Sequence, residues 1–86
     1  MDAAALEQDV RAELKRGYAL RYNAMASILG VWGKEVAAGS FDAEERRFEL
    51  ELTDEETARI IAGLLRDVDD LAVEHRPPAL AVTARW

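Results

Sequence analysis

Few side chains in this sequence could carry out chemistry, and they are scattered. His75 is the only histidine, and Glu74 beside it would point elsewhere on a helix, so a metal site would need ligands from another chain. We interpret His75 as a histidine at the C-terminal end of a helix, where the helix dipole favours a positive charge. Ser27 and Ser40 have no histidine at a spacing that suggests a nucleophile and its base.

The carboxylates give no better arrangement for catalysis. Asp69–Asp70 and Glu55–Glu56 are neighbours in sequence, and neighbouring residues on a helix do not face each other. The sequence contains no cysteine and no glycine-rich phosphate loop. We therefore predict no catalytic residue, no metal ligand and no cofactor, and we expect that the chain is not an enzyme.

The large side chains are concentrated in the first half of the chain, at helical spacing. Their first interpretation is packing in a core or an interface, and the second is a small ligand pocket lined by aromatic rings. The candidate ligand-binding residues are Tyr18, Tyr22, Met25, Trp32 and Phe41.

The elements that would position these residues begin with one helical tract over residues 2–38. Its apolar positions recur every three or four residues, which is the helical period; they are Leu6, Val10, Leu14, Tyr18, Tyr22, Met25, Leu29, Trp32 and Val36. A straight helix of that length would span about 50 Å, whereas a compact chain of this size is only about 30 Å across. We therefore expect a bend near Gly30–Gly33, with Gly39 ending the tract.

The second half predicts a strand–helix–strand unit. Residues 46–52 alternate apolar and charged side chains, as a half-buried strand does. A helix over 54–75 starts at a capping box of Thr53 and Glu56, and Pro77–Pro78 separates it from a strand over 79–86. Strands joined through a helix usually lie parallel in one sheet, and a sheet of two strands is marginal in water.

These elements predict one α+β domain over residues 1–86, whose sheet is completed by dimerisation. The expected partner is a second copy of the chain, in a symmetric homodimer. The candidate interface residues come from the first helix and the last strand: Leu6, Val10, Leu14, Leu80, Val82 and Trp86.

The charge distribution limits the partners. The net charge is −6, and residues 42–56 carry eight acidic and two basic side chains, which we interpret mainly as a solvated face. No basic stripe is present to neutralise phosphates, so we expect no direct nucleic-acid binding. The apolar runs are too short to span a membrane, and Met1–Ala3 lacks the basic start of a secretory signal. Together with the lack of cysteine, this predicts a cytoplasmic location.

The segment from Ser40 to Glu56 resembles the C-terminal region of ArsR-like winged-helix transcription regulators of the actinobacterial type. Trp32, the start Leu52–Glu56, Pro77–Pro78 and the run Leu80–Val82 occupy the corresponding places. The resemblance implies a dimerisation or effector region without its winged helix, which would reach DNA only through that absent domain and would be compatible with a small-molecule effector. Metal sensing is not implied, because the usual Cys and His ligands are missing.

Two alternative functions remain open from the sequence. One is a stand-alone α+β domain that binds a small molecule in the aromatic pocket. The other is a small enzyme of ferredoxin-like type, which no pair of titratable residues favours.

Overall fold

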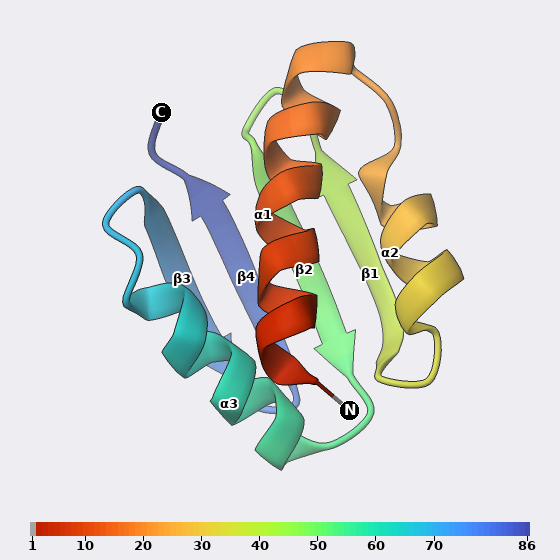
Figure 1. Cartoon of the computed structure of the whole chain (residues 1–86), viewed down its shortest axis with the longest axis vertical. Coiled ribbons are helices and arrows are strands. Elements are labelled where there is room, and N and C mark those ends of the chain that lie inside the picture. Colours follow the sequence, from red (N-terminus) through yellow and green to blue (C-terminus); the bar gives the residue numbers. More distant parts are fainter. Residues whose placement is uncertain (1) are drawn as a thin grey trace.

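The computed structural model describes residues 2–86 and confirms the α+β class, with a long N-terminal helix followed by a strand–helix–strand unit. All three helices cover the same face of one sheet, and the other face of the sheet is open (Figure 1). The elements in order are α1 (Ala3–Leu20), α2 (Ala24–Trp32), β1 (Val36–Asp42), β2 (Arg47–Leu52), α3 (Glu55–Arg66), β3 (Leu71–Arg76) and β4 (Ala79–Ala84).

The four strands form one sheet in the order β1-β2-β4-β3, with every neighbouring pair antiparallel. The strands that the sequence prediction lacked are β1 and β3, so the sheet has four strands within one chain and the predicted shortage of strands is wrong. The helix-linked strands β2 and β3 do run parallel, but β4 inserts between them. The predicted strands at 46–52 and 79–86 are therefore antiparallel neighbours. The element order also differs from the β-α-β-β-α-β order of a ferredoxin-like fold, because this chain has two hairpins, β1–β2 and β3–β4.

The predicted first tract is broken at a different place from the one expected. Arg21 adopts a left-handed conformation with φ 56° and its N–H donates to the Gly17 carbonyl, which ends α1. The Asn23 side chain then accepts from the Met25 N–H and starts α2, so the bend lies at residues 21–23 and not at Gly30–Gly33. An asparagine cap decides this position, which the spacing of apolar residues alone does not reveal.

The predicted second helix is also too long, because residues 71–76 form β3. Asp54, one residue after the predicted cap, starts α3 by accepting from the Thr57 N–H at 2.6 Å and from the Thr57 hydroxyl at 2.9 Å. The helix ends at Arg66, and Leu71 and Val73 then point toward the core while Glu74 and Arg76 are exposed. Residues 71–76 have the two-residue period of a strand, but their apolar side chains also continue the spacing of the preceding helix, so the sequence fits one longer helix equally well.

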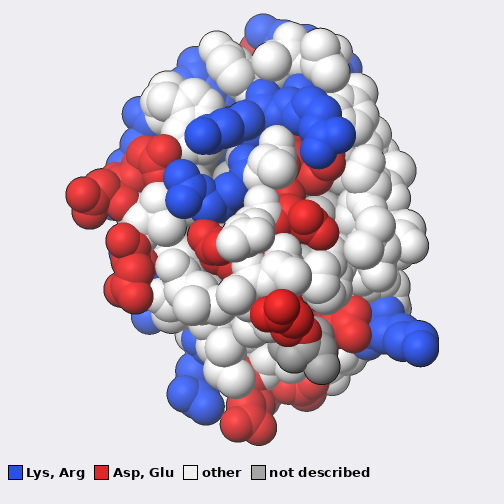
Figure 2. Space-filling model, in the orientation of Figure 1, with Lys and Arg blue, Asp and Glu red and all other residues white. Residues whose placement is uncertain are grey.

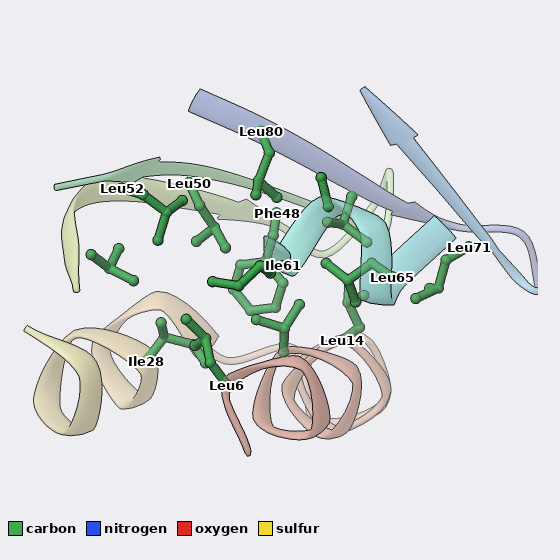
Figure 3. Close-up of a cluster of buried hydrophobic side chains, with 14 of the residues drawn as sticks. Leu6, Leu14, Ile28, Phe48, Leu50, Leu52, Ile61, Leu65, Leu71 and Leu80 are labelled. Carbon is green, nitrogen blue, oxygen red and sulfur yellow. The ribbon is translucent and has the colours of Figure 1, made fainter. Parts of the chain in front are cut away.

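One hydrophobic core lies between the sheet and the helices (Figure 3). Its largest fully buried side chains come from all three helices and from β1, β2 and β4, so every layer contributes; they are Leu6, Val10, Leu14, Ile28, Val36, Phe48, Leu50, Leu52, Ile61, Leu65 and Val82.

Candidate association surface and sheet-face trough

The open face of the sheet carries a trough with a floor of small side chains. Strand β4 contributes Ala79 and Ala81 to this floor, because Leu80 and Val82 point to the opposite, buried face. Charged side chains of the flanking strands form the walls, which we define as Arg47, Glu49 and Glu51 from β2 and Glu74 and Arg76 from β3. The depression, which is open to solvent, has a volume of about 370 Å³.

Arg47 lies across one end of the trough and forms ion pairs with one acid of β2 and one acid of β3. Its guanidinium donates to Glu49 at 3.2 Å, to Glu74 at 3.3 Å and to the hydroxyl of Thr83 at 3.0 Å. The hydrogen bond with Glu74 is the main cause that raises the pKa of Arg47, so this side chain stays positively charged. The guanidinium thus holds one carboxylate of each of two strands in place by a charge-assisted hydrogen bond.

The rest of the trough offers little to hold a metal or a reacting group. Register places Glu51 and Arg76 on either side of Ala79, and neither forms an ion pair with a described residue. Among residues 2–86, no three His, Asp or Glu side chains are grouped as metal ligands. The trough is therefore a solvated, charged face with a hollow floor.

A second surface differs because it lacks charge. Residues 24–41, which form α2, the following turn and most of β1, contain only two charged residues, Lys34 and Glu35, in a chain that is 33% charged. Its exposed apolar side chains include Val31, which is 71% exposed, and Leu29, which is 37% exposed. The side of the molecule over α2 is accordingly almost free of coloured charged atoms in Figure 2. We call residues 24–41 the α2–β1 surface.

Strand β1 adds an unpaired sheet edge to this surface. Thr53 N–H donates to the Glu35 carbonyl and Leu52 N–H to the Pro78 carbonyl, so successive β2 residues point alternately to β1 and to β4. Glu49 therefore pairs with Ser40 through hydrogen bonds. It follows that the N–H and C=O groups of Gly39 and Phe41 point away from β2, and no turn, loop or side-chain hydrogen bond of the described residues engages them.

Small residues fix β1 at this edge. A Cβ atom on Gly39 would lie 2.6 Å from the Glu49 carbonyl oxygen and 2.9 Å from the Met25 side chain, so only glycine allows this approach of β1, β2 and α2. The strand carries no charge between Val36 and Phe41. Residues 37–40 of the strand therefore have only small, uncharged side chains at the edge of the sheet.

The predicted aromatic pocket is not assembled from the residues assigned to it. The Tyr22 hydroxyl donates to the buried carboxylate of Glu13, and the Trp32 indole N–H donates to Asp9 at 2.7 Å. The Trp32 bond ties α2 to α1, the Tyr22 bond ties the connection between these helices to α1, and both bonds satisfy the polar tips of the rings.

The other three assigned side chains are also engaged within the chain. Tyr18 lies under the guanidinium of Arg46 at 4.2 Å, Phe41 stacks on Phe48 with ring centroids 4.8 Å apart, and Met25 is 3% exposed. Neither the trough nor a second depression along α1 is lined by any of the five. The structure therefore assigns these residues to packing.

The predicted interface residues are placed mainly in the core. Five of them are at most 3% exposed within the single chain, namely Leu6, Val10, Leu14, Leu80 and Val82. Trp86 is half-buried and lies 5.8 Å from the Lys15 ammonium. Since their contacts are with their own chain, we assign the five to the core and not to an interface.

His75 lies in strand β3 and not at a helix end, so the interpretation based on the helix dipole is wrong. Its ring is half-buried, and its buried Nε2 atom has no hydrogen-bond partner in the structure. The α2–β1 surface is the feature that the sequence reasoning missed. The signal available for it was the long gap in the charge pattern between Asn23 and Asp42.

Comparison with protein-family models, with curated proteins and with solved structures finds no significant match to this chain. None of the helices in residues 2–86 is both long and apolar enough to cross a membrane.

Proposed function

We propose that this chain is a non-enzymatic association domain that forms a homodimer. The observation that carries the proposal is the α2–β1 surface, which is exposed, almost uncharged and next to an unpaired strand edge. Apolar surface beside open backbone hydrogen-bonding groups favours pairing with another chain. The regulator setting, in which the dimer joins two winged-helix subunits, comes from the sequence resemblance.

The non-enzymatic part of the proposal is supported by the most concentrated group of charges. Arg47 already engages Glu49 and Glu74, and all three lie on an open, water-covered face. A catalytic carboxylate needs a site that excludes water, and the open trough does not provide one.

A second candidate function is the binding of a small molecule in the trough. Its volume of about 370 Å³ lies within the usual range for ligand sites. In this candidate function the ligand would bind in a polar site between Glu51 and Arg76, and not in the aromatic pocket predicted from the sequence. The substitution Ala81→Trp would fill the floor, so a ligand of the trough would lose its binding while the homodimer would remain.

The homodimer is tested by sedimentation equilibrium of the unmodified protein at micromolar concentration. The expected result is a species of twice the chain mass of 9.6 kDa that dissociates on dilution. A mass of 9.6 kDa at every micromolar concentration measured would contradict the proposal.

A further inference from the structure

The backbone of β1 determines how two copies could pair, and this inference rests on the proposed homodimer. We propose that β1 of one copy pairs antiparallel with β1 of a second copy about a two-fold axis at Ser40, which joins the two sheets into one of eight strands. The observations are the outward direction of the backbone groups of Gly39 and Phe41, the lack of charge from Val36 to Phe41, and the position of α2 over the same strand.

The alternation of the strand selects this register. With Ser40 on the axis, Gly39 faces the partner's Phe41, and Phe41 faces the partner's Gly39. Each of these pairs exchanges both of its N–H···O=C bonds, as directly hydrogen-bonded residues of antiparallel strands do. The N–H and C=O groups of Gly39 and Phe41 that point away from β2 then all have hydrogen-bond partners. The irregular part of β1, between Val36 and Ala38, is not needed for this pairing.

The side chains tolerate this pairing. The open-face neighbours of the axis are Ala38 and Ser40, which are small and uncharged. On the helical face, an axis perpendicular to the sheet places α2 of both copies on the same side, since α2 packs on β1 (Figure 1). The exposed residues of α2 are uncharged, with Ala26 and Gly30 one turn apart, so two such helices could approach closely.

The charges at the two ends of β1 favour an antiparallel arrangement over a parallel one. Lys34 lies before the strand, is exposed and forms no ion pair with a described residue. The other end of the strand has Asp42 as its last residue, and the turn that follows carries the exposed acids Glu44 and Glu45, of which Glu44 also pairs with Arg21 of its own chain. Antiparallel pairing brings Lys34 of each copy toward this acidic turn of the partner, whereas parallel pairing would place like charges together. This complementarity identifies a second copy as the occupant of the edge.

A single cysteine tests the register, because the natural chain has none. Residues opposite each other without hydrogen bonds have Cα atoms about 4.5 Å apart, which is within the range of a disulfide. The variant Ser40→Cys is incubated with oxidised glutathione, and Ala72→Cys serves as the matched control, because Ala72 lies on the same open face at the opposite edge strand β3. Circular dichroism verifies that both variants fold as the unmodified chain does.

The expected result is that Ser40→Cys becomes a disulfide-linked dimer about 1,000-fold faster than Ala72→Cys, since pairing raises the effective thiol concentration from about micromolar to about millimolar. Equal, slow cross-linking of both variants, with a dimeric unmodified protein, would overturn the β1 pairing and leave the homodimer standing. A monomeric unmodified protein with slow cross-linking would overturn both proposals.

Discussion

The two edge strands of the sheet, β1 and β3, both have backbone N–H and C=O groups without a neighbouring strand, but their side chains differ. By the same alternation that exposes Gly39 and Phe41 on β1, Val73 and His75 of β3 point their N–H and C=O groups away from β4. Yet β3 carries Glu74 and Arg76 and is followed by two prolines, while β1 is uncharged from Val36 to Phe41 and carries its one charge at its last residue, Asp42.

This difference shows which edge is protected against pairing. Charged residues and proline are the usual means by which proteins prevent an edge strand from adding another strand. β3 carries charges and is followed by prolines, whereas β1 has the irregularity between Val36 and Ala38 at its start and a single charge, Asp42, at its end. In a chain with a net charge of −6, whose copies repel each other, an uncharged edge is also the place where two copies meet at the lowest electrostatic cost.

The largest expected effect concerns the helix that supports the β1 edge. Ile28 is 1% exposed and anchors α2 in the core, so Ile28→Ala should lower the free energy of unfolding by about 2–5 kcal/mol. Leu29→Ala, at the neighbouring partly exposed position, should cost less than about 1 kcal/mol. Urea denaturation measures both. Equal costs for the two variants would mean that α2 does not pack on β1 as described.

The next effect concerns the glycine that lets β1 approach its neighbours. The methyl group of Gly39→Ala would meet the Glu49 carbonyl oxygen and Met25, and should cost about 1–3 kcal/mol of stability. Gly30→Ala on α2 meets nothing within 4 Å and should stabilise the helix by up to about 1 kcal/mol. Thermal unfolding at fixed protein concentration compares the two. A neutral Gly39→Ala would show that β1 lies farther from β2 than the structure places it.

These glycines also show how far the sequence could predict the fold. The strand at Arg47–Leu52 and the α+β class followed from a clear alternation of apolar and charged residues, which few other structures produce. The strand β1 did not, because Ala37, Ala38 and Gly39 have no apolar alternation and Val36 continued the helical spacing. Its place is decided by tertiary packing against Met25 and by pairing with β2, which local propensity does not encode.

The candidate site was predictable only in part for the same reason. The sequence analysis inferred association from a sheet with too few strands, yet the sheet has four strands and the proposed surface is elsewhere. Leu6, Val10 and Leu14 were assigned to an interface because an apolar helical stripe is the same whether its own sheet or another chain covers it. An interpretation of the charge gap required the knowledge that residues 24–41 lie on one side of the molecule.

A smaller effect is expected at the start of α3, the helix that packs on the protected β3 edge. The hydrogen bond from the Thr57 backbone lowers the pKa of Asp54 below its usual value, with the Thr57 hydroxyl as the second cause. Because the folded-state pKa is the lower one, this stabilisation is complete above the unfolded pKa of about 4 and is lost as pH falls through the folded value.

The control for this titration is Asp54→Asn, which keeps a capping oxygen that cannot be protonated. Urea denaturation at neutral pH and at about pH 3 should show a smaller loss of stability for the variant than for the unmodified chain. Equal losses would mean that Asp54 does not cap α3.

The smallest effect is expected in the trough. Glu74→Gln removes one of the two carboxylates that Arg47 engages on the exposed face and should cost about 0–1 kcal/mol. High salt should screen most of that cost. Under the same salt the homodimer should become tighter, because the repulsion between two copies of net charge −6 outweighs the attraction between Lys34 and the partner's turn. Sedimentation equilibrium at low and high salt measures this, and weakening by salt would mean that ion pairs between the copies dominate the association.

The most direct test of the unequal edges is amide hydrogen exchange, followed residue by residue at protein concentrations below and above the dissociation constant. In the monomer, the amides of Gly39, Phe41, Val73 and His75 all lack a partner and should exchange quickly. At high concentration, our account predicts strong slowing at Gly39 and Phe41 and no change at Val73 and His75. Exchange at Gly39 and Phe41 that stays fast in the dimer, or slowing at Val73 and His75 instead, would contradict it.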